Sequence, residues 1–375
     1  MQARRFLLVA ASIGSGHIKA AEAIAEELKI KYPEAEVDIV DFTKWRVSPA
    51  TAFMKSSYLT MLRFVPNLYD LMYKFTGGRA GGISVQNLIS ALTARDIAAL
   101  VRQYRPDVLI CTHPFPAGAA SWRKERHPDE FYLATVITDY SVHQMWIYQN
   151  VQQYFVAREA MKSDLLAAGL RAERVTVTGI PISRAFRQRE DRNEACTALG
   201  LRPELPVVLI MGGGLGLGGV ESSLQELEKI TQPLQILVVA GYNAKLKEKV
   251  EAMAEHSRHY IEAWGFSPCV HELMSAATLL ITKPGALTLT EAMAMELPLL
   301  LHEPIPGPET DNAVYAARRG AAVWANDASR LGESIRSIIE SKEKIEEMQA
   351  SARRMRKPRA AEDIVAVLEN ELKDK

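Results

Sequence analysis

The chain has 375 residues and carries 45 Lys and Arg against 45 Asp and Glu, so its formal net charge at pH 7 is zero. Its 48% hydrophobic and 24% charged residues are typical of a globular protein, and the length is sufficient for two domains. We expect neither a signal peptide nor a transmembrane helix, because no long apolar run follows Met1. We expect no nucleic-acid partner. Three widely spaced cysteines, Cys111, Cys196 and Cys269, indicate free thiols in a reducing cytoplasm.

The charge is unevenly distributed along the sequence. Residues 1–190 carry 24 Lys and Arg against 18 Asp and Glu, and residues 44–105 carry nine basic residues against two acidic ones. The same stretch is rich in large aromatic residues between Trp45 and Phe75. This composition is typical of a contact with an anionic membrane surface, for which Lys55, Arg63, Lys74 and Arg79 are the candidate cations. A helical core region with a solvated basic face would have the same composition, so both interpretations stand at this point.

Short apolar runs alternate with amphipathic helical patterns, which favours parallel sheets. In the first half the predicted strands are Phe6–Ala10, Val37–Val40, Val108–Cys111, Ala134–Ile137, Tyr154–Val156 and Val175–Val177. The predicted helices there are His17–Lys31, most of 50–75, 84–104 and 158–168, and Gly169 is expected to end the last of them.

The same alternation restarts in the second half. The predicted strands are Val207–Ile210, Ile236–Val239, Tyr260–Ile261, Leu279–Ile281, Leu299–Leu301 and Ala322–Trp324. The predicted helices are Glu221–Ile230, Lys245–Glu255, Val270–Ser275, Leu287–Met295 and Asp311–Arg319. The tail, about 328–372, is expected to form two helices broken near Lys357 and Pro358.

These patterns predict an α/β protein with two Rossmann-like, doubly wound domains facing each other across a cleft. The expected division is an N-terminal domain over 1–185, a charged linker over 186–204 with helical character, and a C-terminal domain over 205–355. A final helix over 356–375 could return to the N-terminal domain.

A glycine-rich loop with Gly14 and Gly16 follows the first strand and opens a helix at His17. A helix N-terminus attracts anions, and glycine lets the backbone approach a ligand. The dinucleotide fingerprint is incomplete: Asp41 ends the second strand, where an acid could bind a ribose, but Lys19 stands where the third glycine belongs. His17 should face the cleft, and the helix dipole should keep it neutral and available as a base. A histidine that only caps the turn would show the same pattern.

A second glycine-rich loop follows Val207–Ile210, and six of the eight residues from Gly212 to Gly219 are glycine. This exceeds what a tight turn requires and favours a diphosphate cradle formed by backbone amides. The nominal dinucleotide match is discounted, because the next strand ends in Ala240-Gly241-Tyr242 without an acid. A flexible surface loop is the less favoured alternative.

Three further segments of the second half contain candidate binding residues. Lys283 and Gly285 end a strand, and a helix follows in which Glu291 could take both ribose hydroxyls. Thr288 could instead be the N-cap of this helix and Glu291 its capping-box partner. Glu309 and Asn312 lie at another helix start, where they could bind sugar hydroxyls or merely begin the helix.

In order along the chain, these motifs resemble the monogalactosyldiacylglycerol synthase and processive diacylglycerol glucosyltransferase family of glycosyltransferase family 28. Its C-terminal half is shared with the UDP-GlcNAc lipid transferases of peptidoglycan synthesis. In the first half the resemblance rests on Gly14-Ser15-Gly16-His17, Thr112-His113-Pro114-Phe115 and Thr138-Asp139-Tyr140 with His143 and Trp146. In the second half it rests on Met211 to Gly216, Gly265-Phe266, His271 to Met274, Thr282 to Gly285, and Glu309 with Asn312. It spans about residues 5–325.

The resemblance implies a GT-B fold and an inverting transfer of a hexose from a UDP-sugar to a lipid hydroxyl, with diacylglycerol or a glycolipid as acceptor. His17 and Asp139 would be the catalytic residues near the acceptor hydroxyl. The acceptor side would also include Gly14, Gly16, His113, His143 and Trp146. On the donor side, the diphosphate would meet Gly212, Gly213, Gly214 and Gly216, uracil would meet Phe266, ribose would meet Glu291, and the sugar would meet Glu309 and Asn312. Lys283, Gly285 and Thr288 complete the expected donor site.

The sequence departs from the family pattern at three positions. Ala286 replaces the second glycine after Lys283-Pro284, Pro308 replaces a common Gln, and Thr278 replaces a common Asp. Pro308 lacks an amide donor, which affects the expected contact with the donor sugar more than that with the nucleotide.

Inverting transfer requires a base, stabilisation of the leaving UDP and exclusion of water. Either Asp139 or His17 would act as the base, and the other would orient or polarise it. The sequence does not decide which of the two is the base. No Asp-x-Asp motif occurs, so we expect no metal cofactor and expect the second loop to stabilise the leaving diphosphate. His113 is a weaker candidate that could simply orient its loop.

An acceptor in a bilayer favours the membrane interpretation of residues 44–105. We therefore expect a protein peripherally associated with the cytoplasmic face of an anionic membrane. The alternatives are a UDP-GlcNAc 2-epimerase-like enzyme and a UDP-sugar-binding protein that has lost catalysis. The identity of the sugar and the number of sugars added are left open.

Overall fold

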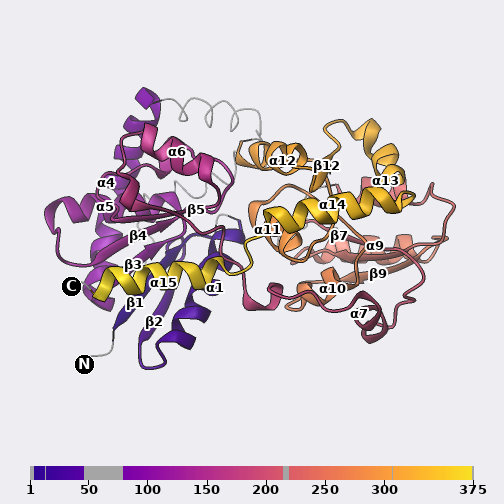
Figure 1. The fold of residues 1–375 in the computed structure, drawn as a ribbon, viewed down its shortest axis with the longest axis horizontal. Coiled ribbons are helices and arrows are strands. Elements are labelled where there is room, and N and C mark those ends of the chain that lie inside the picture. Colours follow the sequence, from indigo (N-terminus) through magenta and orange to yellow (C-terminus); the bar gives the residue numbers. More distant parts are fainter. Residues whose placement is uncertain (1–3, 13, 46–78, 214–218, 306, 374–375) are drawn as a thin grey trace. The chain divides into compact units, whose positions relative to one another are not determined.

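The computed structural model describes residues 4–12, 14–45, 79–213, 219–305 and 307–373. The chain divides into two compact units (Figure 1). Unit 1 comprises Met1–Arg184, Pro306–Pro308 and Lys357–Lys375, and unit 2 comprises Ala185–Ile305 and Glu309–Arg356.

Unit 1 contains a parallel six-stranded sheet in the order β2-β1-β3-β4-β5-β6. Its strands are β1 (Arg5–Ala10), β2 (Glu36–Asp41), β3 (Val108–Cys111), β4 (Tyr132–Val136), β5 (Gln153–Val156) and β6 (Val175–Val177). Its helices are α1 (Gly16–Lys31), α4 (Arg79–Tyr104), α5 (Pro114–Arg126), α6 (Glu159–Ala167) and α15 (Ala360–Lys373), with 3₁₀ helices η1 (Gln144–Trp146) and η2 (Ala172–Arg174). A further 3₁₀ turn, η3 (Arg184–Phe186), lies at the end of this unit's main segment.

The core of unit 1 forms where helices cover this sheet. The central strands are buried on both faces, as continuous apolar runs require in a parallel sheet. Helix α15 packs beside α1, and its Ile364, Val365 and Leu368 join the same apolar cluster as Phe6 and Ile24 (Figure 1). The last helix of the chain therefore completes the core of unit 1.

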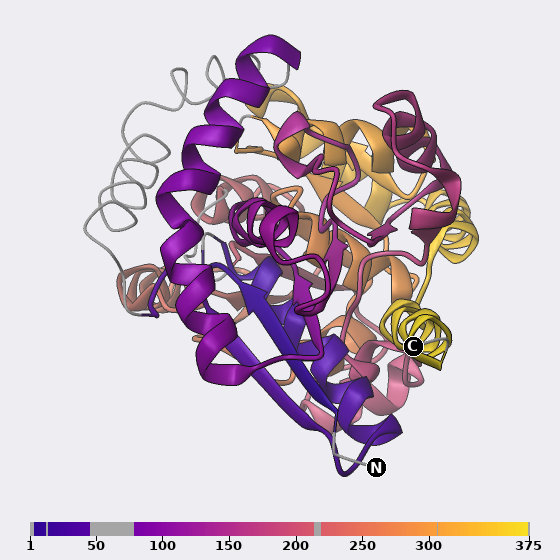
Figure 2. The same cartoon turned by 90° about the vertical axis from the view of Figure 1, so that its left-hand side faces the viewer.

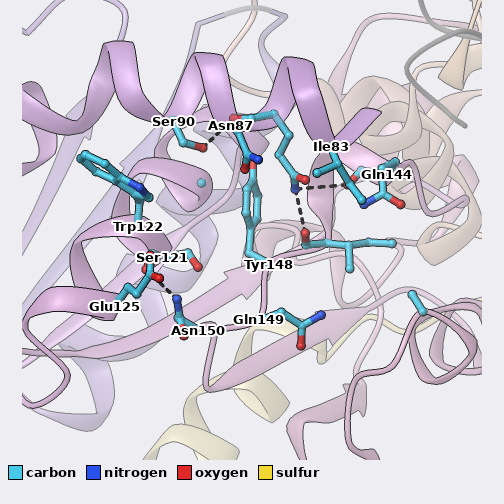
Figure 3. Close-up of a pocket in the computed structure, with 14 residues that line it drawn as sticks. Ile83, Asn87, Ser90, Ser121, Trp122, Glu125, Gln144, Tyr148, Gln149 and Asn150 are labelled. Atoms are coloured by element: carbon cyan, nitrogen blue, oxygen red, sulfur yellow. Dashed lines mark hydrogen bonds between the residues drawn. The ribbon is translucent and has the colours of Figure 1, made fainter. Parts of the chain in front are cut away.

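On another part of unit 1, α4 packs against α5 (Figure 2). Close contact is possible because Gly118 of α5 has no side chain: a Cβ there would lie 2.4 Å from Tyr148 Oη and 2.5 Å from Ser90 Oγ. Helices α4 and α5, with residues 144–150, border a pocket of about 530 Å³ (Figure 3).

Unit 2 repeats the architecture with sheet order β12-β11-β10-β7-β8-β9, again parallel. Its strands are β7 (Val207–Met211), β8 (Gln235–Val239), β9 (Tyr260–Trp264), β10 (Leu279–Thr282), β11 (Leu299–Leu301) and β12 (Ala322–Trp324). Its helices are α7 (Arg192–Ala198), α8 (Val220–Leu227), α9 (Ala244–Ala254), α10 (Val270–Ala276), α11 (Ala286–Ala294), α12 (Pro308–Arg318), α13 (Leu331–Ile339) and α14 (Lys342–Met355), with 3₁₀ turn η4 (Ala328–Arg330).

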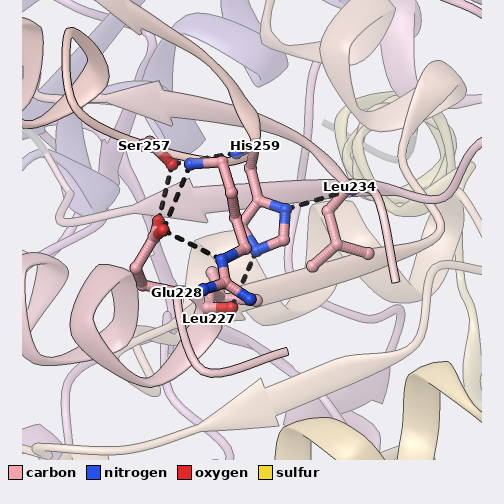
Figure 4. A network of polar contacts seen from close by, with 6 residues as sticks. Leu227, Glu228, Leu234, Ser257 and His259 are labelled. Carbon is pink, nitrogen blue, oxygen red and sulfur yellow. Dashed lines mark hydrogen bonds and ion pairs between the residues drawn. The ribbon is translucent and has the colours of Figure 1, made fainter. Parts of the chain in front are cut away.

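A buried histidine joins the end of α8 to the start of β9 (Figure 4). His259 Nδ1 accepts a hydrogen bond from Leu234 N at 3.3 Å, and Nε2 donates to Leu227 O at 2.9 Å. Beside it, Glu228 accepts from Ser257 Oγ at 2.6 Å. Burial opposes ionisation of Glu228, but such hydrogen bonds outweigh it and keep its pKa below the usual value. With both ring nitrogens bonded, His259 is a structural residue.

The predicted α/β class with two Rossmann-like halves is confirmed, and the predicted strands match the observed ones within three residues. Gly169, at φ +97°, follows the end of α6 as predicted. The charged segment after Arg184 contains only the short α7 and the 3₁₀ turn η3. It is docked rather than free, because α7 packs on α10 and Arg189 donates to the carbonyls of Ser275 and Ala277.

Two predictions for helices are wrong or incomplete. Helix α5 is missing from the sequence prediction, although Pro114 occupies the first helical position, where proline costs no hydrogen bond. The tail forms α13, α14 and α15 rather than two helices, because Ser341 Oγ caps a new helix by accepting from Lys344 N.

Candidate active site

The first glycine loop lies at the carboxyl end of β1 and places His17 in the first turn of α1. Gly14 adopts φ +85°, a conformation that favours glycine, and Gly16 is the first residue of the helix. Asp41 ends β2, as the sequence predicts, and one of its carboxylate oxygens is occupied by backbone amides. Its Oδ1 accepts from Ser12 N at 3.1 Å and from Thr43 N at 3.0 Å, so it ties the end of β2 to the loop.

His17 is held by two oxygen atoms from neighbouring strand ends. Its Nδ1 lies 2.9 Å from Thr112 O and 2.7 Å from Thr138 Oγ1. A carbonyl oxygen can only accept, so Nδ1 carries a proton and Nε2 holds the lone pair of the neutral ring. Burial lowers the pKa of His17 to about 4, although the hydrogen bond to Thr112 opposes this. At neutral pH, His17 is therefore an uncharged imidazole with an available Nε2.

His113 contacts His17 but has a bond of its own. Its ring centroid lies 4.7 Å from that of His17 in an edge-on arrangement, and its Nδ1 accepts from Phe115 N as the cap of α5. Burial first, and the His17 ring second, lower the pKa of His113 well below its usual value. It orients the start of α5, as one of its two sequence interpretations proposed.

The segment after β4 brings the remaining acceptor-side residues to the same region. Asp139 directly follows Thr138, whose hydroxyl contacts His17, and is partly buried. The imidazole of His143 caps η1 by accepting from Met145 N at 3.2 Å. The ring of Trp146 is buried, with its centroid 6.4 Å from that of His17. We call this group the His17 site: His17, Thr138, Asp139, His143 and Trp146.

The described part of the second loop is Gly212, Gly213 and Gly219. Gly213 has φ +68°, and a Cβ there would lie 3.3 Å from Lys283 Cε. Gly219 precedes α8 with φ +62°, and a Cβ there would lie 2.3 Å from His302 Cε1. Side chains at either position would be strained, and the loop residue Gly219 is closed in by its neighbours.

Lys283 supplies a positive charge beside this loop. Its Nζ forms an ion pair with Glu309, and both side chains are largely buried. A Cβ on Gly285 would lie 3.3 Å from Lys283 Nζ, so the missing side chain makes room for the ammonium. Glu309 Oε2 also accepts from Ile305 N at 2.9 Å. In this structure, Glu309 positions Lys283, and its contact with a sugar remains a prediction.

The capping-box alternative for Thr288 and Glu291 is wrong. Helix α11 begins at Ala286 with Gly285 as its N-cap, so Thr288 is already inside the first turn. Asn312 in α12 is fully buried and its Nδ2 donates to Pro284 O at 3.3 Å. Asn312 thus holds the turn after Lys283, and its contact with the donor sugar remains a prediction.

Phe266 follows β9 and is 48% exposed. It stacks on Tyr242, which follows β8 and is 71% exposed, with ring centroids 4.7 Å apart and an interplanar angle of 11°. Exposed large aromatic rings in a stack, at the carboxyl ends of adjacent parallel strands, are suited to a planar ligand.

Several predicted residues fall outside the described part. Gly214 and Gly216 of the second loop, and the candidate membrane cations Lys55, Arg63 and Lys74, lie there. Arg79 begins α4, but its side chain is not described.

Three contacting residues were missed as functional candidates. Thr112 and Thr138 fix the His17 ring, and Tyr242 supports Phe266. A signal existed for each: both threonines follow predicted strands, and Tyr242 is an aromatic residue at a strand end. Their partners are distant in sequence, so the contacts themselves could not be read from spacing.

Two family models match the chain in succession. Residues 17–182 match the monogalactosyldiacylglycerol (MGDG) synthase family, and residues 207–364 match the glycosyltransferase family 28 C-terminal domain. The two matches, one after the other along the chain, indicate a glycosyltransferase. The His17 site lies in the first match, and the second glycine loop with Lys283 lies in the second.

Individual proteins agree with this assignment. The processive diacylglycerol beta-glucosyltransferase of Bacillus licheniformis is 27% identical over 96% of this chain and 94% of its own. Among solved structures, MurG of Acinetobacter baumannii has a TM-score of 0.63 at 16% identity, covering 98% of this chain and 100% of its own. UDP-GlcNAc 2-epimerase of Neisseria meningitidis bound to UDP-GlcNAc has a TM-score of 0.61 at 14% identity, covering 98% and 100%. The two structures support the GT-B fold alone.

Proposed function

We propose that this glycosyltransferase moves a hexose from a UDP-sugar to the hydroxyl of a membrane lipid, with diacylglycerol or a glycolipid as acceptor. The observation that carries the proposal is His17, held neutral with Nε2 available, inside the segment that matches the MGDG synthase family. The name of the Bacillus licheniformis relative supports the acceptor class.

On the acceptor side, we assign the first proton transfer to His17 and Asp139 together. As the C1–O bond to the hexose forms, the acceptor hydroxyl gives its proton to Nε2 of His17, and UDP leaves with the electron pair of the broken bond. The carbonyl of Thr112 and the hydroxyl of Thr138 then face the Nδ1–H of the imidazolium. Burial lowers the pKa of His17 to about 4, so the imidazolium needs a further counter-charge. Asp139 directly follows Thr138, which contacts His17, and its carboxylate could supply this charge.

On the donor side, we assign the diphosphate to the amides of the second loop and to Lys283. Backbone amides and an ammonium that are already in place can stabilise developing negative charge without reorganisation. This assignment gives Lys283 the role that a metal ion plays in other transferases, so we propose that no metal cofactor is required. Ribose would meet Glu291 and Thr288, and uracil would meet Phe266.

Access to a lipid acceptor requires contact with a membrane. No helix in the described ranges is both long and apolar enough to span a bilayer. We propose peripheral binding to an anionic surface on the cytoplasmic side, through the basic and aromatic composition of residues 44–105. Neutralising Lys55, Arg63 and Lys74 together should weaken binding to anionic vesicles and flatten its salt dependence. Sedimentation with neutral and anionic vesicles measures this, and equal binding to both would refute the electrostatic contact.

The transferase proposal is tested by incubating the chain with UDP-glucose, UDP-galactose or UDP-GlcNAc, with and without diacylglycerol, and analysing products by mass spectrometry. A new glycolipid formed only with lipid supports the proposal. Isomerised UDP-sugar formed without lipid would instead indicate an epimerase, the activity named for the Neisseria meningitidis structure. Saturable UDP-sugar binding with no product from any donor would indicate a binding protein that has lost catalysis.

A further inference from the structure

Unit 1 contains a pocket to which the assignments above give no role. It measures about 530 Å³, within the usual range of small-ligand sites. Figure 3 shows Asn87 and Ser90 on α4, Trp122 and Glu125 on α5, and Gln149 among the residues after η1. The pocket is therefore bordered by α4, α5, residues 144–150 and Ala168 after α6, all within a single unit.

The lining has the chemistry of a site for a neutral polyhydroxy ligand. Side-chain amides and hydroxyls dominate it, Trp122 provides an aromatic ring, and the described lining contains Glu125 as its one charged residue and neither Lys nor Arg. A phosphate or an anionic lipid headgroup would need cationic partners. Planar amides and carboxylates instead offer the donors and acceptors that sugar hydroxyls can pair with.

The walls are fixed before any ligand binds. Gln86 of α4 donates to Ile147 O at 2.7 Å, and Asn150 Nδ2 donates to Ser121 O of α5 at 3.1 Å. Tyr148 Oη also donates to Pro114 O at 3.2 Å. These bonds join residues 144–150 to both helices, so little conformational entropy would be lost when a ligand enters.

Other polar groups in the same lining are available. Within the part of the chain that the structure describes, the side chains of Asn87, Gln149 and Glu125 form no hydrogen bond or ion pair, and all three are exposed. The fixed groups thus form the walls, while these three side chains offer unused donors and acceptors to a ligand.

The pocket is next to the His17 site. Gln144, the first residue of η1, lines the pocket, and Trp146, the last residue of the same short helix, has its ring 6.4 Å from that of His17. A ligand in the pocket would therefore contact the same short 3₁₀ helix that contributes Trp146 to the His17 site.

We propose that this pocket is a subsite for a neutral hexose, either the sugar headgroup of a glycolipid or a free saccharide. The inference extends the proposed function, because a glycolipid made by the first transfer could be held here by its sugar. Asn87 and Gln149 would pair with its hydroxyls and Trp122 would contact a face of the ring.

Binding is tested on the full chain with methyl β-D-glucopyranoside, by saturation-transfer NMR, in wild type, N87A and Q149A. Both altered side chains are exposed, so the variants are expected to fold. We expect a saturable signal in wild type and about fivefold weaker binding in each variant, the scale of one lost hydrogen bond. Q103A, on an exposed position of α4 outside the pocket lining, is the matched control and should bind as wild type does.

A second arm identifies the source of the hexose. The KM for a glucosyl-diacylglycerol acceptor is compared with the KM for diacylglycerol in each variant, and the ratio should rise about fivefold in N87A and Q149A if the glycolipid headgroup occupies the pocket. An unchanged ratio with weakened glycoside binding supports a free saccharide. Glycoside binding that is absent in wild type, or equal in all variants, overturns the inference. The binding arm needs no turnover, so it stands even if no glycolipid product forms.

Discussion

A histidine lies beside each glycine loop at a helix start, and the two histidines differ in which ring nitrogen they use: His17 is partly buried in the first turn of α1, and His302 is buried after β11, beside Gly219. Burial lowers the pKa of both His17 and His302 to about 4, so both are neutral at pH 7. In the described structure, His17 uses Nδ1 for Thr112 and Thr138 and leaves Nε2 without a hydrogen bond. His302 uses Nε2 for Ser223 at 3.1 Å.

The hydrogen-bond directions show what His302 does. The hydroxyl of Ser223 donates to Gly219 O at 2.9 Å, so it must accept from Nε2–H of His302. This chain joins the end of β11 to the start of α8, and His302 packs where a side chain on Gly219 would be. The comparison teaches that a shifted pKa alone does not mark a base. In the described structure Nδ1 of His302 also has no hydrogen bond, so the surroundings distinguish the two histidines: His17 lies against His113 and Trp146, whereas His302 packs against Gly219.

The largest expected effect concerns the proton acceptor of the His17 site. H17A and D139N should each lower kcat by about 10²-fold or more, the scale of losing a general base, while the affinity for UDP changes little. Turnover with a diacylglycerol acceptor and calorimetric UDP binding measure the two quantities. H143A, which removes the η1 cap but no atom bonded to His17, is the comparison variant and should cost less. Full turnover in both H17A and D139N would refute the assignment.

His302 should affect stability rather than proton transfer. Its pKa is lowered from 6.5 to about 4 in the folded protein, so the unfolded chain binds the extra proton first as the pH falls. The folded state therefore loses stability between pH 6.5 and pH 4, by about 3 kcal/mol for this group, with no further loss from it below pH 4.

Urea unfolding of H302N between pH 6.5 and pH 4 tests whether His302 causes this loss of stability. Removing the imidazole should lower stability at pH 7, because Ser223 loses a donor, yet make the decline toward pH 4 shallower. H256N removes an exposed histidine and is the control, with the slope of wild type expected. A wild-type slope in H302N would show that the buried imidazole does not set this dependence.

The next effect concerns the charge at the second loop. K283M removes the ammonium beside Gly213 and should weaken UDP binding by about 30-fold, the scale of a charged hydrogen bond. E309Q should not weaken it, because the amide oxygen can still accept from Ile305 N while Lys283 is released from its ion pair. K229M breaks an exposed pair with Glu226 and is the control. Calorimetry measures the affinity of each variant for UDP. Wild-type affinity in K283M would contradict the proposed contact of Lys283 with the diphosphate.

Much of the fold could be predicted from the sequence because parallel strands are continuous apolar runs, as in Val207–Met211. Helix α5 could not, because two prolines and Gly118 resemble a loop until it is known that Tyr148 and Ser90 occupy the space of the missing side chain. The start of α15 was located by Lys357 and Pro358, while the break before α14 depends on the single cap Ser341.

For the site, sequence motifs located His17, Lys283 and Phe266 but not the bonds they form. The tautomer of His17 depends on Thr112, 95 residues away, and the pairing of Lys283 depends on Glu309, 26 residues away. Such contacts follow from strand order in the sheet, which adjacent sequence does not contain. The roles of Gly214 and Gly216 remain predictions.

The smallest expected effect concerns the stacked ring that the sequence did not identify. Y242A should weaken UDP binding about fivefold, because Phe266 would lose the parallel ring 4.7 Å away that holds it in place for uracil. Y242F keeps the ring and should retain wild-type affinity, which separates stacking from any role of the hydroxyl. Y260A removes another exposed tyrosine from β9 and is the control. If Y242A binds UDP as wild type does while F266A does not, Phe266 acts alone and the donor site depends on one ring rather than on a stacked pair.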